Sequence, residues 1–259
     1  MWLRVEWTAW LVLGCLGSAA MGRAAGRPAA SVPELATDRP DFTDTAIVVP
    51  RGSLQLESGF TAGDGDKESR KLDAPEALLR WGIGRRTELR FGPPGFFRIR
   101  GGGERAAGFG DTYLGFKQQL GPVWGGLDLS LIPGVSLPTG AGGVTSEGVD
   151  PEVKLTWSRE LAPPWSVGGS FGFFWPTDAG RHNFTWVPAF EVGRSLGGRW
   201  KTFLEYAGGF PARGDSQHLL HHGYTYALTP VSQADLHVGF GLSSGAPGSF
   251  FAGGFSARY

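Results

Sequence analysis

The feature that most constrains this chain is a repeated alternation of apolar and polar residues with a period of two. From Leu127 to Leu137 the odd positions are leucine, proline or valine, whereas even positions include Asp128, Ser130 and Ser136. Successive side chains of a β-strand point to opposite faces of its sheet, so each such stretch predicts a strand with one apolar face. Aromatic residues crowd the ends of the apolar faces. This pattern is typical of an antiparallel barrel with an apolar outside and a polar inside, located in an outer membrane.

The composition excludes several other classes of protein. The 259 residues include 43 Gly, 18 Phe and 10 Trp, and this aromatic content argues against disorder. The glycines follow no three-residue period, which excludes collagen. A formal net charge of zero gives no electrostatic basis for binding nucleic acid. Beyond the N-terminal region there is no apolar run of about 18 residues, so no membrane-spanning helix is predicted.

The N-terminal segment has the layout of an export signal peptide, which we assign to residues 1–25. Arg4 supplies a positive charge, residues 7–16 are apolar, and residues 18–20 form a cleavage site of small residues. The signal peptide is expected to be cleaved after Ala20 or, alternatively, after Ala25.

The single cysteine, Cys15, lies inside this segment, so the mature chain is expected to have no disulfide. The residues before it, Val12, Leu13 and Gly14, loosely resemble a lipoprotein cleavage box. An acylated Cys15 that anchors the chain is therefore a further alternative.

The alternation begins near Gly52 and continues to the end of the chain. We expect three regions: a signal peptide (1–25), a Pro-rich periplasmic lead or lumen plug (26–51) and an outer-membrane β-barrel (52–259). The pattern predicts an all-β fold, an antiparallel transmembrane barrel of about twelve strands, and bacterial barrels have even strand numbers. The expected strands are 52–62, 75–83, 87–93, 109–119, 124–137, 150–158, 165–175, 183–193, 199–209, 220–228, 232–242 and 249–259.

The connections between these strands alternate in length, as in barrels with short periplasmic turns and longer external loops. Turn pairs such as Gly121-Pro122 and Thr229-Pro230 mark short connections. The longest connection, 94–108, contains Gly101-Gly102-Gly103 and is expected to be a mobile external loop. Its glycines are not a nucleotide-binding signature, because no helix-forming segment follows.

Nearly every charged residue within a predicted strand occupies one of the two alternating sets of positions, and therefore one face of the strand. A Lys or Arg that faces lipid at mid-membrane would cost about 2–4 kcal/mol, so this face is expected to point into the lumen. The charges then either line a selective pore or pair across strands and fill a narrow lumen. A soluble β-sandwich is the alternative fold, but aromatic residues on its solvent faces would favour aggregation. The inward set comprises Glu57, Glu76, Arg80, Glu88, Arg90, Asp111, Lys117, Asp128, Glu152, Lys154, Glu191, Lys201, Glu205, Asp235, His237 and Arg258.

Three histidines, His218, His221 and His222, lie near the fifth long connection. Such a cluster could bind a metal or act as a base in an outer-membrane hydrolase. No His-x-His pair on one strand face supports a metal site, and a strand would turn His221 and His222 to opposite faces. An exposed loop cluster is the default interpretation.

The start of the barrel carries a specific motif, Asp38-Arg39-Pro40-Asp41-Phe42, followed by residues 48–60. Together with segments 79–92, 108–117 and 234–242, it resembles the outer-membrane transporters grouped as the meta-pathway of phenol degradation family. The resemblance covers the chain from about residue 37 to its end and implies a channel for hydrophobic or aromatic compounds. Such barrels usually end in Phe, and here Tyr259 takes that place.

The leading hypothesis is passive uptake of small, hydrophobic or aromatic solutes, which needs no cofactor and no catalytic or metal-binding residue. The alternatives are a plugged structural or surface barrel, and a lipid-modifying enzyme that uses the histidines. Expected partners are outer-membrane lipids, the solutes, and the barrel-assembly machinery acting on the strand that ends at Tyr259. Asp38, Arg39 and Asp41 would either fold into the lumen as a gate or only cover its periplasmic mouth. The lumen and gate candidates are Asp38, Arg39, Asp41, Glu57, Arg80, Glu88, Arg90, Asp111, Lys117, Glu152, Lys154, Glu205 and Asp235.

Overall fold

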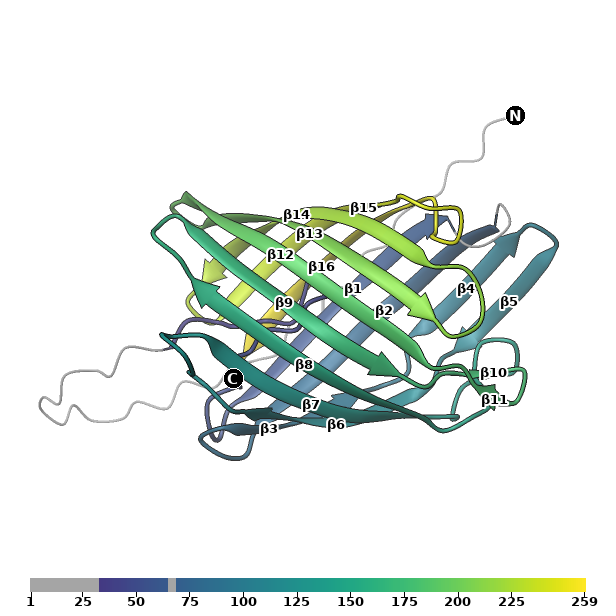
Figure 1. Cartoon of the computed structure of the whole chain (residues 1–259), viewed down its shortest axis with the longest axis horizontal. Coiled ribbons are helices and arrows are strands. Elements are labelled where there is room, and N and C mark those ends of the chain that lie inside the picture. Colours follow the sequence, from purple (N-terminus) through teal and green to yellow (C-terminus); the bar gives the residue numbers. More distant parts are fainter. Residues whose placement is uncertain (1–32, 65–68) are drawn as a thin grey trace, which may run out of the picture. The chain divides into compact units, whose positions relative to one another are not determined.

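The computed structural model describes residues 33–64 and 69–259, which form a closed antiparallel β-barrel (Figure 1). The signal peptide assigned to 1–25, with its alternatives at Ala25 and Cys15, lies outside the described residues. The lead, expected over 26–51, is described from Pro33 onward. No helix in the described part of the chain is long and apolar enough to cross a membrane.

Sixteen strands are found in the described residues. They are β1 (Leu54–Asp64), β2 (Ser69–Gly82), β3 (Thr87–Gly92), β4 (Phe96–Gly101), β5 (Glu104–Phe109), β6 (Thr112–Gln119), β7 (Asp128–Leu137), β8 (Asp150–Glu160), β9 (Trp165–Phe174), β10 (Thr177–Asp178), β11 (Arg181–His182), β12 (Thr185–Gly197), β13 (Trp200–Pro211), β14 (Gln217–Thr229), β15 (Ser232–Gly241) and β16 (Ser249–Arg258).

Twelve of these strands make the barrel wall, which confirms the expected fold class. Their order is β1-β16-β15-β14-β13-β12-β9-β8-β7-β6-β3-β2, and β2 pairs again with β1 to close the ring. All neighbours are antiparallel. The closing pair of β1 with β16 is extended by two backbone hydrogen bonds between Leu54 and Tyr259.

The connections differ at the two ends of the barrel. Short turns lie at the end where Tyr259 is found, and the longer connections extend from the other end (Figure 1). The prediction that 94–108 is a mobile loop is wrong. This segment forms the β4–β5 hairpin, which pairs with the outer part of β2 and extends the wall. The connection 176–182 also contains a small hairpin, β10–β11.

The strand expected over 124–137 begins only at Asp128. Trp124 has a φ of 36° and is followed by two glycines with φ values of 75° and 93°. These left-handed conformations make a turn and cannot continue an extended strand.

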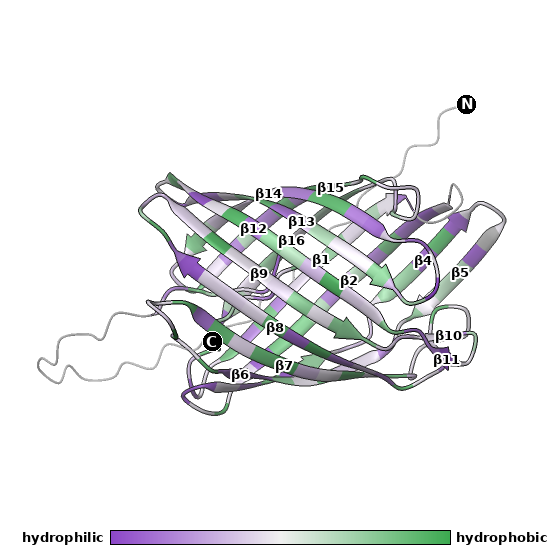
Figure 2. Ribbon diagram, in the orientation of Figure 1, coloured by the Kyte–Doolittle hydropathy of each residue, from purple (hydrophilic) through white to green (hydrophobic). Residues whose placement is uncertain are grey.

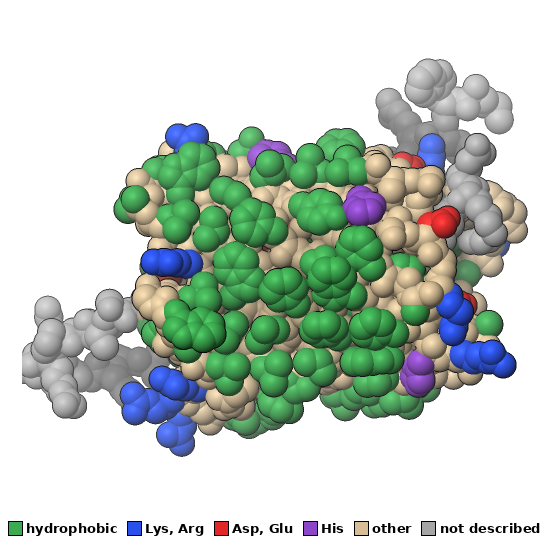
Figure 3. Space-filling model, viewed as in Figure 1, with side chains coloured by type: hydrophobic (Ala, Val, Ile, Leu, Met, Phe, Trp, Pro, Cys, Tyr) green, Lys and Arg blue, Asp and Glu red, His purple; other side chains and the backbone are tan. Residues whose placement is uncertain are grey.

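The two faces of the wall have opposite chemistry, and the strands alternate along their length in Figure 2. Trp81, Phe190 and Phe240 are about half exposed on the outer face, whereas Arg80 and Lys117 are fully buried inside. Figure 3 shows a broad apolar band over the visible face, with Lys and Arg at both of its ends. This arrangement suits lipid on the outside and contradicts the soluble sandwich.

Candidate functional site

The lead, defined here as residues 33–51, runs inside the barrel. At the end with short turns, Arg258 donates to the carbonyl oxygens of Pro33, at 2.5 Å, and of Glu34, at 3.2 Å. The chain then enters the lumen and returns to the same end, where it joins β1. Ala46 and Val49 are almost completely buried on the return path. The lead thus occupies the lumen as a loop whose two ends lie at one mouth.

Carboxylates of the wall hold the backbone of the lead. Glu57 accepts hydrogen bonds from the backbone N–H groups of Asp38, at 2.9 Å, and Arg39, at 2.8 Å. Glu205 accepts from the N–H groups of Phe42 and Thr43 at 2.8 and 2.7 Å. Glu88 accepts from the N–H of Val49 at 2.7 Å. Charged acceptors make the stronger class of hydrogen bond, so these contacts fix the path of a segment that has no strand of its own.

The cations of β2, β3, β6 and β8 pair with two aspartates of the lead. We call Arg80, Arg90, Lys117 and Lys154 the cationic wall. Asp38 pairs with three of them: with Arg90, with Lys117 at 2.9 Å and with Arg80 at 3.3 Å.

The second aspartate, Asp44, pairs with Arg90 at 2.6 Å and with Lys154 at 2.8 Å. Arg80 also bonds Glu57 and Glu88, both at 2.8 Å, so wall and lead charges form one buried network. Removing one partner from a buried ion pair leaves an uncompensated charge and is strongly destabilising.

Arg39 lies beside the cationic wall and contacts β2 and β15. Its guanidinium pairs with Glu76 at 2.8 Å and with Asp235 at 3.3 Å. It lies against Gly59 and Gly254, which are paired across β1 and β16, and a Cβ on either glycine would collide with it. The two glycines therefore leave the space in which Arg39 is seated.

The strands β12 to β15 carry carboxylates and histidines toward the lumen. We call Glu191, Glu205, His221, Asp235 and His237 the acidic wall. Glu205 accepts from Nδ1 of His221 at 3.0 Å, and Nε2 of His221 lies 2.5 Å from Nδ1 of His237. All of these contacts are buried, so Glu205 connects the backbone of the lead to a pair of histidines.

Two cavities lie on either side of residues 39–41. The outer cavity, about 380 Å³, is lined by Arg39, Pro40 and Asp41 together with residues near the long loops. A second cavity of about 180 Å³ toward the short turns is lined by the same three residues. Asp41 faces the acidic wall, and its Oδ1 is buried without a hydrogen-bond partner among the described residues. Residues 39–41 thus form the partition between the two cavities.

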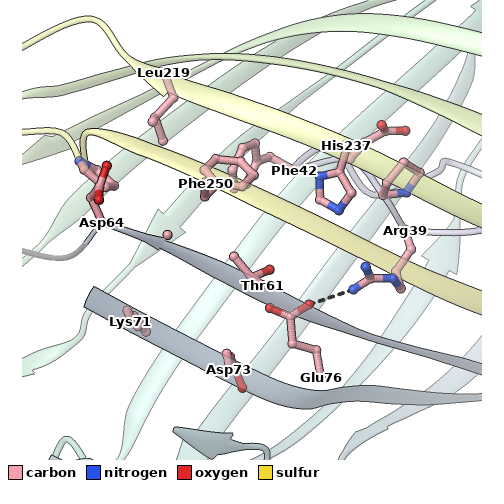
Figure 4. A pocket seen from close by; sticks show the side chains of 14 residues that line it. Arg39, Phe42, Thr61, Asp64, Lys71, Asp73, Glu76, Leu219, His237 and Phe250 are labelled. Atoms are coloured by element: carbon pink, nitrogen blue, oxygen red, sulfur yellow. Dashed lines mark hydrogen bonds and ion pairs between the residues drawn. The ribbon is translucent and has the colours of Figure 1, made fainter. Parts of the chain in front are cut away.

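Aromatic side chains dominate one side of the outer cavity (Figure 4). The ring of Phe42 lies 5.0 Å from His221 and 6.1 Å from Phe250, both in edge contact. His237 lies 6.0 Å from Phe250. Phe42, Phe250, Leu219 and His237 line a space of the volume that small-molecule pockets usually have.

The structure corrects the expectation of an exposed histidine cluster in a loop. All three histidines lie on β14, where His221 points into the lumen and is buried. His218 forms a hydrogen bond with the hydroxyl of Tyr206, and His222 forms one with the carbonyl oxygen of Phe203. Both histidines are on the face of β14 opposite to that of His221. No group of three or more metal-ligating side chains suited to an ion occurs in the described ranges. The histidines therefore do not form a common site.

Asp111 also differs from its expected position on a lumen-facing strand. It lies between β5 and β6, where it accepts hydrogen bonds from Gly140 N at 2.9 Å and Ser146 N at 3.0 Å. Burial alone would raise the pKa of this carboxyl, but the Ser146, Thr145 and Gly140 donors outweigh it and lower the pKa. Asp111 therefore organises the external loop and takes no part in the contacts of the lead.

The other candidates lie along the lumen. Ten of them, all except Asp41, Asp111 and Glu152, make direct polar contacts between wall and lead, and Glu152 lies 3.8 Å from Lys154 at the edge of the network. Sequence reasoning missed Asp44, Phe42 and Phe250 as site residues, and it placed His221 in an exposed loop. Asp44 follows the Asp38–Phe42 motif after a single residue, and this closeness to Asp38 and Asp41 could have revealed it.

The comparisons with known proteins agree with this architecture. The family described as "Putative MetA-pathway of phenol degradation" matches residues 37–259. No curated protein sequence gives a significant match. The COG4313 outer membrane channel from Pseudomonas putida F1 is similar in fold, with a TM-score of 0.66, 11% identity, and coverage of 82% of this chain and 97% of that one. The NanC porin has a TM-score of 0.53 at 8% identity, covering 79% and 98% of the two chains. The fold is that of an outer-membrane barrel.

Proposed function

The chain belongs to the MetA-pathway phenol-degradation family, and from this premise we propose that it is a passive outer-membrane channel for small aromatic or otherwise apolar solutes. Diffusion down a gradient forms no bond, so the channel uses no cofactor. The lead acts as its gate, and the lumen contacts of Asp38 and Arg39 hold the gate closed.

One observation carries the proposal: residues 39–41 separate two cavities that open toward opposite ends of the same lumen. A small displacement of this segment would join the cavities into one path. The outer cavity, which a solute from outside would reach first, has apolar walls at Phe42, Phe250 and Leu219. These walls favour an aromatic or apolar solute over a sugar.

The gate is tested by single-channel conductance of the refolded protein in a planar bilayer, with and without deletion of residues 37–44. The deletion removes the partition and both aspartates of the network, so the conductance should rise from a low level to a steady higher one. Heat-modifiable migration in gels shows whether each form is folded. A folded barrel without conductance in either form would contradict the channel.

The solute class needs a separate measurement, because neutral aromatic molecules cross lipid unaided. Proteoliposomes should take up benzoate, whose charge slows its passage through lipid, faster than they take up arabinose of similar size. Equal rates for both solutes would leave a general pore and contradict the preference for aromatic solutes.

A plugged structural barrel is the second candidate. The buried network of the cationic wall favours it, since many paired charges can fill a lumen permanently. This candidate predicts no conductance in the full chain and no aromatic uptake. Conductance and aromatic uptake of the full chain therefore separate the two functions.

We also propose that the barrel-assembly machinery recognises the last strand, β16, and the residue that follows it, by the exposed aromatic side chains of Phe251, Phe255 and Tyr259. Tyr259→Phe should assemble as well as the wild type, whereas Tyr259→Asp should reduce the amount of heat-modifiable barrel in membranes. Equal amounts of both variants would contradict this recognition.

A further inference from the structure

Four arginines lie at the outer end of the wall, on the strands that carry the unexpected hairpin. They are Arg70 on β2, Arg98 and Arg100 on β4, and Arg105 on β5, and all are exposed. Arg70 is directly opposite Arg100, and Arg100 is directly opposite Arg105. Opposite side chains of an antiparallel pair lie about 5 Å apart, and like charges in such positions are destabilising. Three guanidinium groups therefore follow one another across the sheet.

The arginines point away from the lumen. Lys71 and Asp73, their neighbours in β2, line the outer cavity, and Phe97 in β4 lines another lumenal space. Because successive side chains of a strand alternate, Arg70, Arg98 and Arg100 lie on the outer face. Arg105 shares that face because it is opposite Arg100.

No ion pair of the described residues involves these four arginines. Among the acids whose side chains the structure describes, the nearest in register is Asp64, opposite Arg70 on β1. Its carboxylate instead accepts from the backbone N–H and the hydroxyl of Ser249, both at 3.0 Å. The row thus presents its positive charge outward.

The height of the row places it at the surface of the outer leaflet. Arg70 comes twelve residues before Gly82, at the other end of β2. At roughly 3.3 Å per residue and a tilt of about 40°, this gives a rise of about 30 Å, whereas the apolar band of such barrels is about 25 Å tall. Leu72 and Phe109 are exposed on the same face, and Phe96 lies 5.5 Å from Phe109. Apolar side chains therefore lie in the same patch as the arginines.

We propose that this face, Arg70, Arg98, Arg100 and Arg105 with Leu72, Phe96 and Phe109, binds the phosphorylated glycolipid of the outer leaflet, the lipid A part of lipopolysaccharide. Guanidinium groups bind phosphate oxygens in a bidentate manner. A row that crosses two strand spacings, about 10 Å in all, can contact more than one phosphate of a single molecule. A zwitterionic phospholipid carries one phosphate beside an ammonium group and matches such a row poorly. The acyl chains would lie against the aromatic residues.

The test compares full-length variants by native mass spectrometry in detergent with purified bisphosphorylated lipid A. The variant Arg70→Gln/Arg100→Gln/Arg105→Gln should bind at least about tenfold more weakly than wild type, because several charge-assisted hydrogen bonds are lost. The matched control is Arg85→Gln/Arg86→Gln/Arg159→Gln, which removes three exposed arginines at the opposite end of the barrel and should bind like wild type. Heat-modifiable migration confirms folding, and Arg100→Gln alone repeats the test if the triple variant does not fold.

Two further probes identify the recognised group. Dephosphorylated lipid A should not bind above background, and inorganic phosphate should not displace bound lipid A. Wild-type binding by the outer triple variant, or equal binding of the dephosphorylated lipid, would overturn the proposal. Phosphatidylethanolamine binding as tightly as lipid A would show an unspecific lipid surface and overturn it as well. Conductance is not part of this test, so its result is independent of the channel function.

Discussion

The two sides of the lumen hold the same segment in different ways. On the cationic wall, three buried cations and the partly exposed Lys154 surround two aspartates of the lead, and the charges are matched at short distances. On the acidic wall, Glu205 binds backbone N–H groups and a histidine, Glu191 makes no ion pair within the described residues, and aromatic rings border an open cavity. The difference indicates that the cationic wall anchors the lead, while the acidic side is where a path can open.

The largest effect is expected for Asp38→Asn, which keeps the shape of the side chain and removes its charge. Arg80, Arg90 and Lys117 would lose a shared counter-ion, at a cost of about 3–5 kcal/mol to the seated lead. The lead should leave the lumen in part, and single-channel conductance should increase toward that of the 37–44 deletion. The control is Glu34→Gln, whose exposed pair with Lys201 contributes about 0–1 kcal/mol. Unchanged conductance in Asp38→Asn would refute the anchoring role of the cationic wall.

A smaller effect is expected for Glu205→Gln on the acidic wall. The amide keeps one acceptor oxygen, so one of the N–H groups of Phe42 and Thr43 loses its partner, at a cost of about 1–3 kcal/mol. Limited proteolysis should detect a lead that is cleaved faster than in wild type but more slowly than in Asp38→Asn. Faster cleavage of the lead in Glu205→Gln than in Asp38→Asn would mean that the acidic wall, and not the cationic wall, anchors the lead.

Each aromatic contact of the lead should contribute less than the hydrogen bond lost in Glu205→Gln. Phe42→Ala removes edge contacts with His221 and Phe250, each of about 0.5–1.5 kcal/mol. The outer cavity would become larger and less aromatic, so benzoate uptake should lose its advantage over arabinose. Phe251→Ala is the matched control, since Phe251 is on β16 beside Phe250 but faces outward. A loss of preference in the control would mean that the effect comes from the strand and not from the cavity.

The sequence predicts the wall better than the interior. Period-two alternation determines which face of each strand meets lipid, so the twelve strands and the buried positions of Arg80 and Lys117 could be predicted. The hairpin β4–β5 could not, because glycines at 101–103 suit a loop and a tight turn equally well. The contacts of the lead could not be predicted from the sequence either, because a segment without periodicity gives no register against the wall. Only the folded lumen brings Asp44 to Lys154 or Phe42 to Phe250.

Asp111 tests whether the external loop is independent of both walls. Its lowered pKa means that its contribution to loop stability is present above the unfolded pKa of about 3.9 and is lost as the pH falls through the lower folded value. At pH 6, Asp111→Asn should therefore increase hydrogen exchange at Gly140 and Ser146, whose N–H groups lose a charged acceptor. At a pH below the lowered folded pKa the two proteins should exchange alike, since the wild-type carboxyl is then protonated. Conductance should not change in either condition, because Asp111 contacts no residue of the lead, and a change would connect the loop to the gate.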